Sequence, residues 1–191
     1  MVILTDAWRK RYEDDFATMK VHPDKWTEAR SVAKRLSSNE ARYAPAASGT
    51  GVPWYLIAIL HEREASGDFA KYLGDGEPLD RVTHDVPRGR GPFHTFNDGC
   101  IDALKYDGFD KVRDWSIGSV LFHMEAFNGE GYHDHGIPSP YVWAGSNKYR
   151  RGKYLSDNKF SYTAVDRQLG GAVILAAIII GMKTSTDEEG A

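Results

Sequence analysis

The chain has 191 residues, of which 41% are hydrophobic and 27% charged, and its formal net charge is -3. This length suits one sizeable core, so we expect a single domain over residues 1–191. The charge gives no overall basic field, which argues against nucleic acid as a partner. The lone Cys100 excludes an internal disulfide, and the mixed charge near the start is unlike a secretory signal. We therefore expect the protein to fold in a reducing cytoplasm.

The N-terminal region, residues 1–50, contains two predicted amphipathic helices. Start signals and apolar residues at helical spacing indicate helices over 5–19 and 23–42. A loop rich in small residues is expected at 44–53. Pro53 then suits the first turn of a third helix that ends near Glu64.

The rest of the chain predicts a mainly α fold with a small β region. Residues 67–93 are rich in Gly, Pro and Asp, which predicts a small β-hairpin or an ordered loop. The apolar run at 170–182 has about 13 residues, too few for a membrane span of roughly 20, so we expect a core helix and no stable membrane insertion. Residues 183–191 are expected to be a disordered tail. Helices are predicted at 96–106, 116–127, 140–149 and 165–182.

The third helix carries the stretch "YLIAILHEREASGDF", in which an apolar run ends abruptly in charge. If Leu60 faces inward, Glu64 continues its face one turn later, whereas Glu62 points to the opposite side. Desolvation at the border of an apolar face disfavours a charged carboxylate, which suits a general acid near neutral pH. The alternative is a solvated helix end in which Arg63 pairs with one of the two glutamates.

A carboxyl group that acts as a general acid near neutral pH is what glycoside hydrolysis requires. This reaction usually also needs a second group across the cleft, either a nucleophile or a base that positions water. The segment after the third helix offers several carboxylates and Thr83 as a neutral group that could hold water. Spacing does not select among the carboxylates, which are Asp68, Asp75, Glu77, Asp80 and Asp85.

Two motifs in the sequence resemble those of a known family. "HEREASGDF" resembles the Glu-x-Ser signature at the end of the catalytic helix in goose-type lysozymes and lytic transglycosylases. "EAFNGEGY" is similar to their Tyr-Asn-x-Gly turn, with Phe127 in place of the tyrosine. Over residues 52–175, the order of motifs resembles a group of phage and prophage lysozyme-like proteins, often single-domain endolysins.

The resemblance implies a lysozyme-like α+β fold with a small β-hairpin region beside an active-site cleft. It implies that Glu64 is the general acid and that Ser66 is a nearby helper or structural cap. An acid and a threonine are expected in the hairpin, and Glu77 and Thr83 occupy those places, with Asp85 as a further candidate for the second group. Contacts to sugar are expected from Asn128, Gly129, Tyr132, Tyr141 and Trp143.

We therefore expect a monomeric endolysin that needs no cofactor. It would be a muramidase, a glycoside hydrolase that cleaves the bond between N-acetylmuramic acid and N-acetylglucosamine in bacterial peptidoglycan. A lysis role implies dependence on a holin, with the enzyme held in the host cytoplasm until its release to the cell wall. The alternatives are a lytic transglycosylase acting on the same bond and a non-catalytic phage structural protein that binds the wall.

Histidines raise the further possibility of a metalloprotease, which chelation would inactivate. His133 and His135 would share one side of an extended segment and could form a ligand pair. However, "HEREA" lacks the second histidine of the zinc motif His-Glu-x-x-His, and no spacing implies a third ligand. We therefore expect no metal site.

Overall fold

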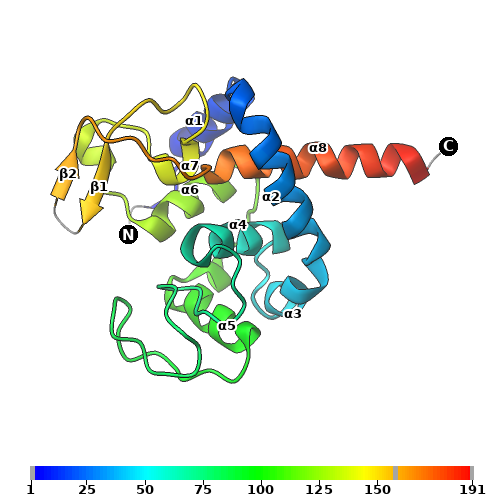
Figure 1. Ribbon diagram of the computed structural model, residues 1–191, viewed down its shortest axis with the longest axis vertical. Coiled ribbons are helices and arrows are strands. Elements are labelled where there is room, and N and C mark those ends of the chain that lie inside the picture. Colours follow the sequence, from blue (N-terminus) through cyan, green and yellow to red (C-terminus); the bar gives the residue numbers. More distant parts are fainter. Residues whose placement is uncertain (1–2, 157–158, 190–191) are drawn as a thin grey trace. The chain divides into compact units, whose positions relative to one another are not determined.

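The computed structural model describes residues 3–156 and 159–189, and the chain is mainly helical (Figure 1). A two-stranded antiparallel sheet, β1 (Lys153–Ser156) with β2 (Lys159–Ser161), accompanies the helices. This confirms the predicted mainly α class, although the small sheet lies at 153–161 and not in the segment 67–93 where a hairpin was considered. The helices are α1 (Asp6–Ala17), η1 (Pro23–Lys25), α2 (Trp26–Ser38), α3 (Glu40–Thr50), α4 (Trp54–Ala65), α5 (Phe96–Tyr106), η2 (Phe109–Lys111), α6 (Ile117–Asn128), η3 (His133–His135), α7 (Pro140–Trp143) and α8 (Gly171–Glu189).

The chain groups into two compact units, where we had expected a single domain. Unit 1 comprises Met1–Arg35 and Ser116–Ala191, and unit 2 comprises Leu36–Trp115. Unit 2 is therefore an insertion in the sequence of unit 1, and the chain passes from one to the other within α2.

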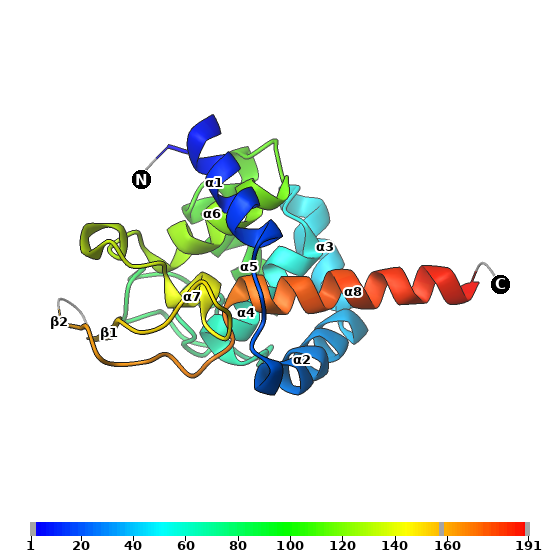
Figure 2. The same cartoon turned by 90° about the horizontal axis from the view of Figure 1, so that it is seen from above.

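Unit 1 is built on the close packing of α1 against α6 (Figure 2). Thr5 caps α1, since its side chain accepts a hydrogen bond from the Trp8 amide at 3.2 Å. Gly118 permits the approach of α6, because a Cβ at this position would lie 2.3 Å from the Arg9 carbonyl oxygen. The remaining core comes from α6, α7 and the first half of α8, with fully buried Val120, Leu121, Met124, Val142, Val173 and Ile174.

The first half of α8 is the buried core helix predicted from its apolar sequence. Of residues 183–191, which we expected to be disordered, 183–189 continue α8 as far as Glu189, and 190–191 lie outside the described residues. They contain no proline, and extending an existing helix by one residue costs less than starting a new one. Among the described residues, no helix is both long and apolar enough to cross a membrane.

Unit 2 is formed by α3, α4 and α5, with α3 packed against both of the others. Residues 56–61 of α4 are buried on every side of the helix. The predicted loop at 44–53 is wrong for most of its length, because α3 extends to Thr50 and ends at Gly51 in a left-handed conformation (φ 76°). Tertiary packing outweighs the cost of the internal Pro45, since α3 packs against α4 and α5 with Tyr43 and Ala46 buried.

The segment between α4 and α5 is an ordered loop, the second of the two structures predicted for it, and not a hairpin. Residues 66–95 are all described and contain no strand, apart from an isolated antiparallel bridge between Lys71 and Pro78. Side chains of the loop accept hydrogen bonds from its backbone amides. These bonds take the place of the hydrogen bonds between strands that the amides would make in a hairpin. The two-stranded sheet lies instead in unit 1, where Tyr154 pairs with Phe160.

Candidate functional site

The charged end of α4 follows directly on its buried segment. Glu62, Arg63 and Glu64 are each partly exposed. We predicted that Glu64 alone would continue a buried face, but α4 is buried all round just before this turn, so both glutamates lie at its edge. The facing of the helix therefore distinguishes them less than expected.

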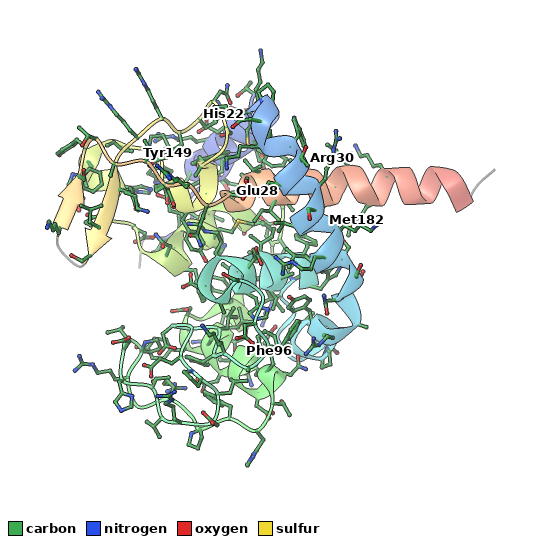
Figure 3. The ribbon with its side chains drawn as sticks, in the orientation of Figure 1. His22, Glu28, Arg30, Phe96, Tyr149 and Met182 are labelled. Atoms are coloured by element: carbon green, nitrogen blue, oxygen red, sulfur yellow. The ribbon has the colours of Figure 1, made fainter. Side chains whose placement is uncertain are left out.

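An aromatic cluster fixes the last turns of α4. His61 is fully buried, and its ring lies 4.4 Å from that of Phe96, labelled in Figure 3, and 4.7 Å from that of Phe69. Its Nδ1 lies 3.0 Å from the hydroxyl of Tyr43 on α3. These contacts of His61 hold the glutamate-bearing end of α4 in place.

Ser66 ends α4 in a strained conformation. Its amide donates to the Glu62 carbonyl at 3.0 Å, and the next amide, that of Gly67, donates to the His61 carbonyl at 3.2 Å. Its φ is 53°, and within the described part of the chain it is the one residue other than glycine with a positive φ. This conformation costs about 1–2 kcal/mol for a residue with a Cβ. Strain of this kind often accompanies functional sites.

The loop folds back onto the turn that carries Glu64. Gly76 has a φ of 73°, and a Cβ on it would lie 2.9 Å from the Glu64 carbonyl oxygen. Two hydrogen bonds with Tyr72 hold this part of the loop, one from the Gly76 amide at 2.9 Å and one to the Glu77 carbonyl at 2.7 Å. The backbone next to Glu77 therefore lies against the end of α4.

Glu77 is held as an anion by the loop itself. Its Oε1 accepts hydrogen bonds from the amides of His84 and Asp85, both at 2.7 Å. These bonds, followed by the nearby His84 ring, hold the pKa of Glu77 below its usual range. The same bonds fix the loop, so this carboxylate has a structural role.

Asp75, two residues earlier, is driven in the opposite direction. Burial raises its pKa, and the negative charges of Glu77 and Asp85 raise it further. Its Oδ1 accepts the Glu77 amide at 2.9 Å, while Oδ2 is buried without a hydrogen-bond partner. Neighbouring carboxyl groups with opposite pKa shifts are typical of acid–base sites. The sequence offered Asp75 only as one of several carboxylates.

The other two predicted groups of the loop differ in their surroundings. Thr83 is buried, and its hydroxyl donates to the Pro87 carbonyl at 2.6 Å and accepts from the Arg90 amide at 3.0 Å. Its proton is therefore committed to the backbone rather than to a water molecule. Asp85 is exposed, and its amide is the group that Glu77 binds.

A partly buried polar triad ties the loop to α5. The Tyr72 hydroxyl and Arg90 Nε each donate to Asp102 Oδ2 at 2.9 Å. Burial, and then the bond to Asp102, raises the pKa of Tyr72. The loop thus has fixed supports on both α4 and α5.

The predicted sugar-contacting residues all belong to unit 1, whereas the predicted catalytic residues belong to unit 2. Asn128 is the last residue of α6, and Gly129 caps it with a φ of 100°. Tyr132 and Tyr141 are buried, so they do not offer an open ring face for stacking. Trp143 is also mostly buried, but it lines a pocket.

That pocket lies within unit 1 and has a volume of about 250 Å³. At its base, Glu125 is 3% exposed, and its Oε2 accepts a hydrogen bond from the Tyr12 hydroxyl at 2.5 Å. His133 Nε2 lies 2.9 Å from Glu125 Oε1. Burial raises the pKa of Glu125, although Tyr12 and His133 oppose the shift. The lining residues are Trp8, Arg11, Tyr12, Asp15, Glu125, His133, Gly136, Ile137, Pro138 and Trp143.

Sequence reasoning missed this pocket, although two signals pointed to it. Glu125 is the one carboxyl group in the mostly apolar sequence of α6, and Trp8 and Tyr12 are four residues apart on one face of α1. Because the Tyr12–Glu125 contact joins residues 113 positions apart, only the folded chain reveals the combination.

His133 and His135, the predicted candidates for a ligand pair, have separate partners. They lie in the 3-10 helix η3, where His133 contacts Glu125, while the His135 ring stacks on Phe160 at 3.8 Å. Within residues 3–156 and 159–189, no group of three or more His, Cys, Asp or Glu side chains could hold a metal ion.

In comparisons with known proteins, no family model, curated protein or solved structure matches this chain. Function must therefore be inferred from the chemistry of the side chains. Two places offer such chemistry: the end of α4 with its loop in unit 2, and the pocket around Glu125 in unit 1.

Proposed function

We propose that the chain is a muramidase that cleaves the bond between N-acetylmuramic acid and N-acetylglucosamine in peptidoglycan. The observation that carries this proposal is the junction of α4 with its loop. There, Gly76 of the loop lies against the backbone of Glu64. Gly76 is followed in the sequence by Glu77, whose pKa is lowered, so that its side chain is an anion. A partly buried carboxyl group and a carboxylate held ionised thus come from adjoining segments of backbone.

The surroundings of Glu64 and Glu77 suggest a different role for each in the reaction. Glu64 donates a proton to the glycosidic oxygen as the bond breaks, which is the part of a general acid. Glu77 keeps its negative charge and stabilises the positive charge that develops on the sugar, or orients the attacking water. Its backbone hydrogen bonds fix its Oε1, so little rearrangement is needed during the reaction.

A lytic transglycosylase acting on the same bond is the second candidate. The bonding of the loop favours it, because Glu77 Oε1 and the Thr83 hydroxyl are already engaged by backbone groups. In such an enzyme, the substrate's own hydroxyl replaces water, and no second carboxylate has to activate it.

Mass spectrometry of fragments released from purified peptidoglycan tests the proposal and separates the two reactions. Hydrolysis leaves reducing N-acetylmuramic acid ends, which we expect. Anhydromuramic ends would replace the hydrolase with the transglycosylase. If no glycan fragments are released while the protein binds the wall, the non-catalytic alternative is correct. Loss of activity on chelation, with cleaved peptides in place of glycans, would identify a metalloprotease.

A further inference from the structure

We propose that the stretch around the two-stranded sheet of unit 1 binds the surface of a bilayer that contains anionic phospholipids, without crossing the bilayer. Residues 148–167, called here the basic segment, contain six lysines and arginines but only two aspartates, in a chain whose net charge is -3. Positive charge is therefore concentrated in one stretch of a chain that is negative overall, which is typical of a surface for an anionic partner. The proposal does not depend on cleavage by Glu64.

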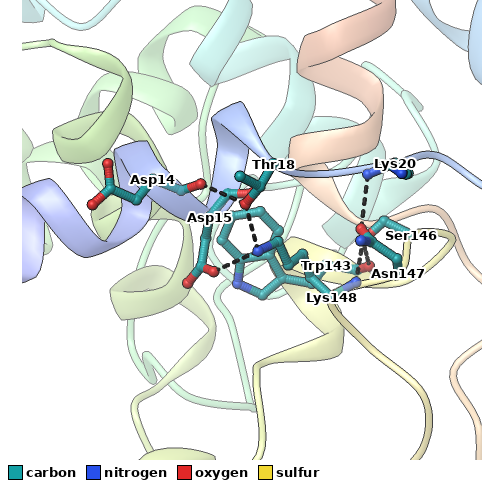
Figure 4. Close-up of polar contacts among 8 residues, drawn as sticks. All are labelled: Asp14, Asp15, Thr18, Lys20, Trp143, Ser146, Asn147 and Lys148. Carbon is teal, nitrogen blue, oxygen red and sulfur yellow. Dashed lines mark hydrogen bonds and ion pairs between the residues drawn. The ribbon is translucent and has the colours of Figure 1, made fainter.

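The start of the basic segment is anchored to the residues that follow α1 (Figure 4). Asn147 Oδ1 accepts a hydrogen bond from the Lys20 amide at 2.7 Å, and the Asn147 amide donates to the Lys20 carbonyl at 2.9 Å. Lys148 Nζ lies 2.8 Å from Asp15 Oδ1 and donates to the Thr18 hydroxyl at 2.8 Å. The charge of Lys148 is thus matched, and the residues after it begin from a fixed point.

Most of the other cations in the basic segment have no such match. Lys153 is paired with Asp166, whose Oδ1 lies 3.3 Å from Lys153 Nζ. Four further cations are exposed and form no ion pair with any residue that the structure describes, namely Arg150, Arg151, Lys159 and Arg167. Their charges are available to the phosphate groups of lipid heads, which attract exposed lysines and arginines.

An aromatic cluster holds the sheet of the basic segment rigid. Tyr154 and Phe160 pair across the two strands, and the ring of His135 stacks on Phe160 with centroids 3.8 Å apart. The two ring nitrogens of His135 lie 3.0 Å from the Tyr162 hydroxyl and 3.1 Å from the Tyr154 hydroxyl. A two-stranded sheet is only marginally stable by itself, so this packing gives it a defined shape before any partner binds.

Apolar side chains are exposed among the unpaired cations. Leu155, at the point where the register of the two strands shifts, is 54% exposed, and Tyr162 is 61% exposed. Aliphatic side chains and tyrosine rings beside lysines and arginines suit the interface of a bilayer. A single-stranded nucleic acid would instead need open ring faces for stacking, whereas the ring of Phe160 is covered by His135. The combination therefore favours a lipid surface.

The test is sedimentation of the full chain with vesicles of phosphatidylglycerol and phosphatidylcholine in equal amounts, and with vesicles of phosphatidylcholine alone. We expect binding only to the anionic vesicles, and release by about 0.5 M salt, which screens charges at a surface. Each cation near an anionic bilayer strengthens binding about fivefold, so the double variant Arg150→Gln, Arg151→Gln should bind at least about tenfold more weakly. Leu155→Ser removes the exposed aliphatic group and should weaken binding about threefold.

The matched control is the double variant Arg81→Gln, Arg88→Gln, which removes the same charge from unit 2. Both arginines are exposed, in a loop that also exposes Val82 and Val86. This variant should bind the anionic vesicles as the parent does, and circular dichroism verifies that both double variants are folded. Equal weakening in the two double variants would refute the basic segment as the site. A parent protein that ignores anionic vesicles, or that binds both kinds of vesicle equally, would also refute it.

Glu64→Gln separates this inference from the proposed function, because it should bind anionic vesicles as the parent does. A parent protein that binds these vesicles but cleaves no glycan would refute the muramidase and keep the lipid-binding surface. Binding to a single-stranded DNA oligonucleotide, with none to anionic vesicles, would replace the bilayer with a nucleic acid and overturn the proposal.

Discussion

Asp107 occupies a position where a carboxylate destabilises the fold. It follows the last residue of α5, where the helix dipole disfavours negative charge, and burial raises its pKa to about 6. An acid whose pKa is higher in the folded than in the unfolded state contributes stability at low pH. That contribution is lost as the pH rises through the folded value.

We predict that Asp107→Asn is more stable than the parent above pH 6, by about 1–2 kcal/mol after allowance for partial exposure, and similar to it near pH 4. Urea unfolding at both pH values measures the difference between variant and parent. Asp80→Asn, an exposed aspartate of the same unit, is the control and should show no such dependence. A difference that does not change between the two pH values would contradict the assignment.

At the same scale, the sequence predicted some side chains better than others. Glu64 was expected at the edge of a buried segment, and it lies there, because hydrophobic runs reveal burial directly. The opposite states of Asp75 and Glu77 were not predictable, since they depend on which backbone amides the loop turns toward each carboxyl group.

Among the elements, the loop behind Glu64 depends on a glycine. At Gly76, a methyl group would clash with the Glu64 carbonyl oxygen and would also require a positive φ. We predict that Gly76→Ala lowers the free energy of unfolding by about 2–3 kcal/mol and reduces glycan cleavage. Gly89→Ala has a similar φ of 77° but open space around the new methyl group, so it should cost only about 1 kcal/mol. Equal losses in the two variants, measured by denaturant unfolding, would show that contact with α4 is unimportant.

The contact of α1 with α6 offers a second pair of variants. Gly118→Ala places a methyl group against the Arg9 carbonyl, so we expect a loss of about 2 kcal/mol or more. Gly181→Ala, in an open part of α8, should instead gain up to about 1 kcal/mol from helix propensity. Thermal unfolding of both variants checks these opposite signs. A stable Gly118→Ala protein would mean that the two helices can separate without cost.

Helices were predicted well where local signals agreed. The boundaries of α5 match the predicted 96–106, and the structure shows why: Thr95 and Asp98 form a reciprocal capping box. By contrast, α3 was missed because its small residues and Pro45 resemble a loop. The predicted hairpin at 67–93 is wrong, because a sequence rich in Gly and Asp is compatible both with a hairpin and with a loop held by hydrogen bonds to its own side chains.

On the scale of the whole molecule, the insertion of unit 2 into unit 1 divides the candidate chemistry. The carboxylates around Glu64 lie within Leu36–Trp115, and the pocket of Glu125 lies in the flanking segments. No local sequence pattern predicted this division, since one boundary between the units falls inside α2 and the other just before α6. Substitutions in one unit can therefore test its side chains without altering those of the other.

A lysis role makes a prediction for whole cells. We expect that the purified 21.4 kDa protein, added from outside, does not lyse intact Gram-negative cells, because their outer membrane shields the peptidoglycan. Permeabilised cells should clear. Strong killing of intact cells, measured by colony counts, would instead indicate a membrane-active segment.

The central claim concerns which glutamate at the end of α4 does the chemistry. Turbidity clearing of permeabilised cells by the parent, Glu64→Gln and Glu62→Gln tests it most directly. Losing a general acid costs about 10²–10⁴-fold in rate, so Glu64→Gln should fold normally and clear no cells on the time scale of the parent. Glu62→Gln should stay within a few-fold of the parent, since it is the backbone of Glu64 that the loop carrying Glu77 contacts. If Glu62→Gln clears no cells while Glu64→Gln clears them as the parent does, the assignment of Glu64 as the acid is contradicted.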